Sequence, residues 1–143
     1  MDQQNFENHK RNVAGFHYLL SFLLIAGLIG AVVNAVYQFG TGDFFTALLL
    51  LLFSATLFLM SWFIRTFPIR AQDRAIRAEE GLRYFILTRQ PLSNKLSITQ
   101  IAALRFAPDD ELLPLVEKTL AENMAPTDIK KAIKNWRADH HRV

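Results

Sequence analysis

The chain has 143 residues, and its 16 lysines and arginines against 13 aspartates and glutamates give a formal net charge of +3. This length allows one domain, or one membrane unit with one small soluble unit. Because the chain has no cysteine, disulfides, thiolate metal sites and cysteine nucleophiles are excluded.

Two long apolar runs fill much of the first half of the sequence, at 16–36 and 44–64. Each run would form a helix about 31 Å long, which matches the hydrocarbon core of a bilayer at about 30 Å. Asp43, the only formal charge between Arg11 and Arg65, lies in the link. Since the link is too short to recross the bilayer, we expect a transmembrane helical hairpin. Its expected parts are an N-terminal segment at 1–14, transmembrane helices at 15–37 and 44–65, and an outer turn at 38–43.

The basic residues that flank the two runs indicate their orientation. Lys10 and Arg11 precede the first run and Arg65 follows the second, whereas the link contains neither Lys nor Arg. Basic residues are enriched on the cytoplasmic side of membrane proteins, so we expect a multi-pass protein with both termini in the cytoplasm. The alternative is a signal peptide cleaved after Ala35, but the first run is longer than usual for one and a second run follows at once.

Small residues recur along one face of each expected transmembrane helix. In lipid, small side chains let two helix backbones approach closely, which stabilises their association. We therefore expect the helices to meet through these rows, with the amide of Asn34 bonded to the link or to a hydroxyl of the other helix. The expected packing residues are Gly27, Gly30, Ala31 and Asn34 in the first helix and Ala47, Ser54 and Ser61 in the second.

After the second run the composition becomes polar, and Pro68 can open a new helix. We expect a membrane-proximal amphipathic helix at 66–90. Its apolar stripe, at three- and four-residue steps, is Ala71, Ala75, Ala78, Leu82 and Phe85. Its basic residues either determine the topology alone or also contact anionic lipid head groups. The candidate head-group contacts are Arg65, Arg70, Arg74 and Arg77.

The segment at 91–143 carries start signals for three short helices. Ser97 and Gln100 fit a capping box, acidic residues follow Pro108, and Pro126 suits a first helical turn. These signals predict helices from Ser97 to about Phe106, from Pro108 to about Asn123, and from Ala125 to near Trp136. The predicted shared core is Ile98, Ile101, Leu104, Leu112, Val116, Leu120, Ile129, Ile133 and Trp136. The predicted fold class is therefore all-α, a transmembrane hairpin followed by an amphipathic helix and a small cytoplasmic three-helix bundle.

The last predicted helix carries a basic row, which is a candidate partner surface. Its members are Lys130, Lys131, Lys134 and Arg137. The row could instead pair inside the bundle with the acidic residues at 109–111. It superficially resembles a nucleic-acid recognition helix. However, the segment is neutral overall and lacks the glycine turn common in such motifs, which argues against nucleic acid as a partner.

Signatures of catalysis and of metal or cofactor binding are missing from the sequence. The four histidines lack the spacing that would place two ligands on one helix face. There is also no Ser/His/Asp set and no glycine-rich phosphate loop. We therefore expect no enzymatic activity, no metal and no cofactor. No role is assigned to the histidines, which are His9, His17, His140 and His141.

Segments at both ends of the chain resemble a known family. The most specific parts are Asn8 with His9, Phe16 with His17, and the segment at 128–136. Through them the chain resembles an uncharacterised family of small two-span bacterial inner-membrane proteins, a domain of unknown function common in Bacteroidetes-type bacteria. Ala14 stands where many relatives have proline. The resemblance implies a bacterial inner (cytoplasmic) membrane location with a cytoplasmic helical tail, and it implies no activity.

Together these features predict a non-enzymatic interaction or scaffold protein anchored in the inner membrane. Its expected partners are membrane lipids and an unidentified protein or a second copy of the chain. One alternative is a membrane-tethered regulator that binds nucleic acid through the basic last helix. Another is an accessory subunit of a membrane enzyme or transporter complex.

Overall fold

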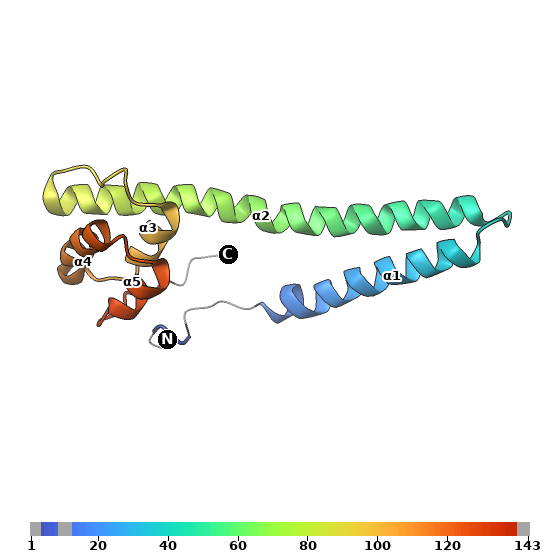
Figure 1. The fold of residues 1–143 in the computed structure, drawn as a ribbon, viewed down its shortest axis with the longest axis horizontal. Coiled ribbons are helices and arrows are strands. Elements are labelled where there is room, and N and C mark those ends of the chain that lie inside the picture. Colours follow the sequence, from blue (N-terminus) through green and yellow to red (C-terminus); the bar gives the residue numbers. More distant parts are fainter. Residues whose placement is uncertain (1–3, 9–12, 140–143) are drawn as a thin grey trace. The chain divides into compact units, whose positions relative to one another are not determined.

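The computed structural model describes residues 4–8 and 13–139, and over these residues the chain is helical and has no strand (Figure 1). The predicted all-α class is therefore confirmed. The chain divides into two compact units. We call Asn12–Phe67 the hairpin unit, and Met1–Arg11 with Pro68–Val143 the bundle unit.

The hairpin unit contains a π-helical segment η1 (Gly15–Leu20), α1 (Ser21–Tyr37) and the first half of α2 (Phe44–Thr88). The two helices are joined by a tight turn. In it, Gly40 has a φ of 79°, a backbone conformation that residues with a side chain rarely adopt. The hydroxyl of Thr41 donates a hydrogen bond to the carbonyl of Gln38 at 2.8 Å, which closes the turn.

Both helices of this unit are long and apolar enough to cross a membrane, over Gly15–Tyr37 and within Phe44–Thr88. Only 6% of the most apolar stretch of each is buried within the protein. Large side chains such as Val36 and Phe45 are each 70% exposed. A continuous exposed apolar surface of this kind marks contact with a partner or a membrane. Length and composition therefore support a membrane location.

The predicted helix packing in the hairpin is found only in part. Of the predicted packing residues, Ala31 and Ala47 are buried, and Asn34, Ser54 and Ser61 are half-buried. Gly27 and Gly30 are exposed, and a Cβ added to either would meet no atom within 4 Å. They do not lie at a close helix contact, so this part of the prediction is wrong. In this part of α1 the half-buried positions are instead Leu24 and Leu28.

α2 continues through Pro68 as one helix of 45 residues. The prediction of a separate helix starting at this proline is therefore wrong. A proline inside a helix removes one backbone hydrogen bond and crowds the carbonyl four residues earlier. Here the helix formers that follow Pro68, mainly alanine and arginine, continue the helix across that defect.

The bundle unit consists of the second half of α2, α3 (Ile98–Leu104), α4 (Asp109–Glu122) and α5 (Pro126–Ala132) (Figure 1). The predicted capping box is present. The Ser97 hydroxyl accepts the Gln100 N–H at 3.2 Å, and the Gln100 side chain accepts the Ser97 N–H at 2.9 Å. α4 ends at Glu122 and is followed by Asn123, whose left-handed φ of 48° is a common helix stop.

α5 ends at Ala132 rather than near Trp136, because Ile133 already has extended backbone angles. The carboxylate of Glu111 accepts the backbone N–H groups of Lys134 and Asn135, at 2.9 and 3.0 Å. In a longer helix these groups would bond to carbonyls of α5. Trp136 therefore lies in an irregular segment, where its ring packs against that of Phe106 at a centroid distance of 5.0 Å.

The core of the bundle unit is shared between α2, α3, α4, α5 and the loops between them. The predicted core residues that are buried are Ile101, Leu104, Leu112, Val116, Ile129 and Ile133. Ile98 and Trp136 are half-buried, and Leu120 is 38% exposed, so its assignment to the core is wrong. Ile76 and Phe106 are also buried in this core, and the sequence did not predict them. The chain start also joins this unit, since the buried Gln4 accepts the Asp139 N–H at 2.8 Å.

Candidate functional site

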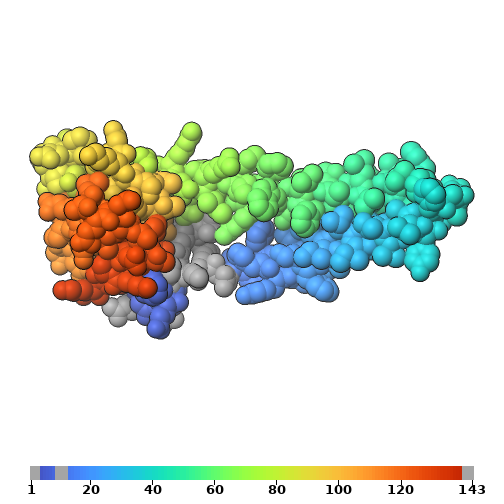
Figure 2. All heavy atoms as spheres, in the orientation of Figure 1, coloured from blue at the N-terminus to red at the C-terminus, as the bar shows by residue number. Residues whose placement is uncertain are grey.

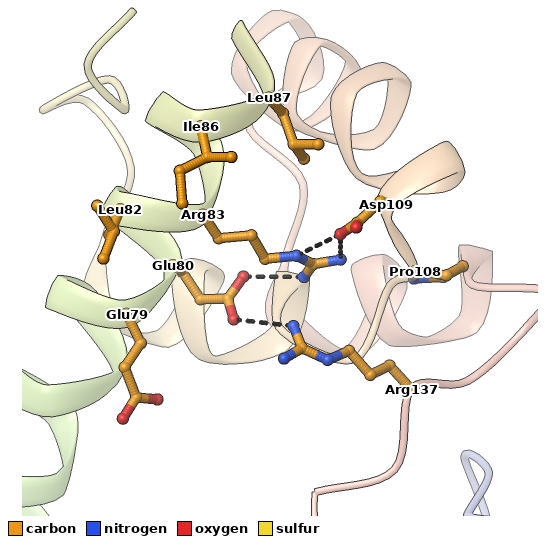
Figure 3. Close-up of a pocket in the computed structure, with 9 residues that line it drawn as sticks. All are labelled: Glu79, Glu80, Leu82, Arg83, Ile86, Leu87, Pro108, Asp109 and Arg137. Atoms are coloured by element: carbon orange, nitrogen blue, oxygen red, sulfur yellow. Dashed lines mark hydrogen bonds and ion pairs between the residues drawn. The ribbon is translucent and has the colours of Figure 1, made fainter. Parts of the chain in front are cut away.

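A cleft of about 670 Å³ opens in the bundle unit, where the last turns of α2 meet the start of α4 and the end of the chain (Figure 3). Its lining combines apolar side chains with a group of charges. The lining residues are Glu79, Glu80, Leu82, Arg83, Ile86, Leu87, Pro108, Asp109 and Arg137.

Arg83 is at the centre of the charged group (Figure 3). Its Nη1 pairs with Glu80 at 3.0 Å, its Nε donates to Asp109 at 2.6 Å, and its Nη2 donates to the carbonyl of Ala107 at 2.8 Å. The Arg83 side chain is only 12% exposed, and that of Glu80 is 10% exposed. One guanidinium therefore connects α2 to the loop before α4 and to the first residue of α4.

This arrangement is costly to break. Two charges taken out of water lose hydration, and only their mutual hydrogen bonds offset that loss. Removing one partner leaves the other charge buried and unpaired, which typically costs about 3–5 kcal/mol. Two of the three carboxylates in the lining, Glu80 and Asp109, are bonded to a guanidinium. Arg83 therefore holds the cleft in shape, and the two carboxylates are already engaged.

Arg137 forms the cationic rim of the cleft. Its backbone N–H donates to the carbonyl of Phe106 at 2.8 Å, which fixes the position of the segment. Its guanidinium lies 3.7 Å from the second carboxylate oxygen of Glu80, beyond ordinary hydrogen-bond distance, and its side chain is 56% exposed. Such a guanidinium can bind a further anion, a carboxylate above all.

The facing wall of the cleft is apolar. It is formed by one side of the end of α2, where Leu82 is 62% exposed, Ile86 60% and Leu87 39% (Figure 3). The cleft therefore presents apolar surface beside a cationic rim. This is a suitable surface for a segment that carries both apolar and acidic side chains.

The predicted basic row lies only partly on a helix, because α5 ends at Ala132, before its last two members. The Nζ of Lys130 lies 5.6 Å from the ring centre of Phe106, and the Nζ of Lys131 lies 5.7 Å from the ring centre of Phe6. Lys134 is exposed in the irregular segment, and Arg137 belongs to the cleft. The use of these four residues as a partner surface stays a prediction.

The acidic start of α4 does bond to the segment after α5. It does so through backbone N–H groups and one amide, and not through the basic side chains of the predicted row. Glu111 accepts the backbone N–H groups of Lys134 and Asn135, as well as the Asn135 side-chain amide at 2.9 Å. The hydrogen bond from the Lys134 backbone is the main cause that lowers the pKa of Glu111 below 4.5, partly opposed by desolvation. Glu111 therefore fixes the segment that carries Arg137, and we call this set of hydrogen bonds the Glu111 latch.

The candidate head-group arginines are mostly at the surface. Arg70, Arg74 and Arg77 are exposed, and a guanidinium nitrogen of Arg77 lies 3.4 Å from the carbonyl of Leu96. Arg65 is half-buried, with its guanidinium 5.7 Å from the ring centre of Phe16. Contact of these residues with lipid stays a prediction.

The histidines add no site to the part of the chain that the structure describes. The Nδ1 of His17 lies 3.1 Å from the backbone nitrogen of Val13. His9, His140 and His141 lie outside the described residues. Within residues 4–8 and 13–139, no group of three or more His, Asp or Glu side chains is placed to hold a metal ion.

The sequence did not reveal the group formed by Glu80, Arg83 and Asp109. Glu80 and Arg83 are three residues apart, a spacing that pairs side chains on a helix. However, Glu79 is equally well spaced, four residues before Arg83. Only the packing of the bundle on α2 selects Glu80. Asp109 is 26 residues from Arg83, so no local pattern could have joined them.

Fold and site thus define a small all-helical protein with two candidate membrane-crossing helices and a helical bundle that carries a cleft. A family of unknown function, DUF6526, matches over residues 1–143, and the chain belongs to this family. The predicted resemblance to an uncharacterised family is therefore confirmed. A search of the curated proteins finds no match, and neither does a search of the solved structures.

Proposed function

We propose that the protein is a non-enzymatic interaction module anchored in the inner membrane of a bacterium, with both termini in the cytoplasm. The hairpin unit provides the anchor. The bundle unit binds a protein partner through the cleft beside Arg137. The cleft is the observation that carries this proposal.

The chemistry of the cleft indicates what kind of segment it binds. Ile86 and Leu87 offer apolar surface that gains free energy when covered, at about 25 cal/mol per Å². The exposed guanidinium of Arg137 is placed to pair with a carboxylate at the rim. We therefore propose a short partner segment with one or two large apolar residues next to Asp, Glu or a chain-terminal carboxylate.

The ion pairs made by the carboxylates in the cleft favour a binding role over a catalytic one. A general acid or base must be available to exchange a proton with a substrate. In this cleft Glu80 lies between two guanidinium groups, and Asp109 is bonded to Arg83. Glu79, the third carboxylate of the lining, is exposed to water. Their arrangement supports a role in holding the shape of the cleft.

The test is co-purification of the full chain in mild detergent, with variants that alter the cleft. Arg137→Gln removes the rim charge, and its matched control is Arg70→Gln, an exposed arginine of α2 outside the cleft. Ile86→Ser removes apolar surface, and its control is Leu120→Ser, an exposed leucine on α4. We expect proteins that bind the natural chain and both controls, and that are lost with both cleft variants.

Two results would contradict the proposal. One is recovery of the natural chain without any protein partner. The other is an unchanged set of partners in Arg137→Gln and Ile86→Ser. Mass spectrometry of the bound proteins, with the amount of bait equalised, decides between these outcomes.

A further inference from the structure

The second half of α2 carries an apolar face that the bundle leaves uncovered. We call it the outer face, and its residues are Ala71, Ala75, Ala78, Leu82 and Phe85. All five are exposed, including Leu82 at 62% and Phe85 at 44%. Ile76 and Glu80, which are buried against the bundle, lie on the opposite side of the helix, since successive residues are about 100° apart. Figure 2 shows the atoms of α3, α4 and α5 (orange to red) gathered on one side of the end of α2.

The spacing of the outer face is that of a coiled coil. Its residues follow one another at steps of four, three, four and three, so Ala75 and Leu82 occupy a positions and Ala71, Ala78 and Phe85 occupy d positions. In a globular protein such an apolar stripe normally faces the protein's own core. Here it faces away from the core, which calls for a partner helix.

We propose that the outer face pairs with the outer face of a second copy, as a short parallel coiled coil. The charges beside the stripe fit this occupant. In a parallel coil, a g residue of one helix lies opposite the e residue five positions later in the other. Arg74 is at g and Glu79 is at e, five positions apart. A two-fold axis therefore brings together two pairs of opposite charge, one on each side of the seam.

Both of these residues are available for such pairs. Arg74 and Glu79 are exposed, and neither takes part in an ion pair within the described residues. Their neighbour Glu80, by contrast, is buried and engaged with Arg83. Of these two neighbouring glutamates, Glu80 is thus bonded within the bundle, and Glu79 would pair with the second copy.

The parallel direction follows from the membrane anchor, so this step rests on the proposed function. α2 has 45 residues, and about 20 suffice to cross a bilayer. The outer face begins after this span. Two copies inserted with the same topology have α2 helices that leave the membrane in the same direction. Their outer faces can therefore meet only in parallel.

The anchor also explains how so short a coil can form. The outer face covers about two heptads, and three of its five residues are alanines, which bury little area. Two such helices would pair weakly in dilute solution. Confinement to one membrane raises their effective concentration, as a linker does between two binding modules.

The absence of cysteine from the chain permits a direct test. Single-cysteine variants of the full chain, Ala71→Cys, Ala75→Cys and Ala78→Cys, are oxidised in membrane vesicles. Only cysteines whose Cα atoms approach within about 7 Å can form a disulfide. The matched controls are Arg70→Cys, on another side of α2, and Ala121→Cys, an exposed alanine of α4. We expect several-fold more covalent dimer at the three outer-face positions, and equal yields at all five would overturn the proposal.

The flanking charges give a second test of the same pairing. In the Ala78→Cys background, Arg74→Glu places like charges opposite each other and should lower the dimer yield several-fold. Adding Glu79→Arg restores the opposite charges in reverse order and should restore the yield. A lipid surface or an unrelated protein covering the outer face would give no such rescue, and this result would contradict the parallel dimer.

The outcome can be separated from that of the proposed function. Arg137→Gln lies outside the outer face, so it should abolish partner capture while leaving the disulfide yield unchanged. If the outer-face cysteines form no disulfide while the partner is still captured, the dimer proposal alone is contradicted. Recovery of the chain in the soluble fraction after membrane washing would remove the anchor on which both proposals depend.

Discussion

The hairpin unit and the bundle unit depend on different kinds of residues. In the hairpin unit, apolar side chains are exposed along both helices, and the helix bounds follow from composition and a glycine turn. In the bundle unit, a few polar side chains join residues far apart in the sequence, as Arg83 joins Asp109 and Glu111 joins Lys134. The difference teaches that the hairpin should tolerate single changes on its exposed faces, whereas the bundle should lose stability when one such polar residue is removed.

The largest effect is expected for Arg83→Ala. It leaves the nearly buried Glu80 without its closest partner, so we expect a loss of about 3–5 kcal/mol from the free energy of unfolding of the bundle. The exposed control Arg70→Ala should change it by less than about 0.5 kcal/mol. Denaturant unfolding in mild detergent, followed by Trp136 fluorescence in a Trp62→Phe background, measures both. Equal effects of the two arginines would break the comparison.

An intermediate effect is expected in the hairpin, and only at a packed position. Ala47 is 1% exposed, so Ala47→Leu should cost about 1–3 kcal/mol through overpacking. Gly30→Ala places a methyl group where no atom lies within 4 Å, and should cause no loss. An SDS titration followed by Trp62 fluorescence in a Trp136→Phe background compares them. If Gly30→Ala were as harmful as Ala47→Leu, the predicted glycine contact would be real after all.

The smallest effect is a pH dependence that belongs to the bundle alone. The pKa of Glu111 is lowered in the folded state, mainly by the backbone N–H of Lys134, so its carboxylate stabilises the fold above the unfolded pKa. This stabilisation is lost as the pH falls below 4.5 towards the folded pKa. The melting temperature of Glu111→Gln should therefore lie below that of the natural chain at neutral pH, and the difference should shrink in acid. A difference that does not change with pH would contradict the latch.

The sequence predicted well what depends on neighbouring residues. The apolar runs, the capping box at Ser97 and the helix stop at Asn123 all have local causes, and the structure contains each of them. It predicted poorly what depends on residues brought together by folding. The end of α5 is set by Glu111, more than 20 residues earlier in the chain. The cleft needs Glu80 rather than Glu79 to face the bundle, and no spacing within α2 distinguishes the two.

The irregular segment after α5 has a consequence for how this family could diversify. Arg137 is held by one carboxylate latch and one backbone hydrogen bond, to Glu111 and Phe106, and not by a helix. Replacing its side chain therefore changes the rim of the cleft while the helices and their core remain as they are. A relative with another side chain at this one position would therefore have a different binding preference and the same core.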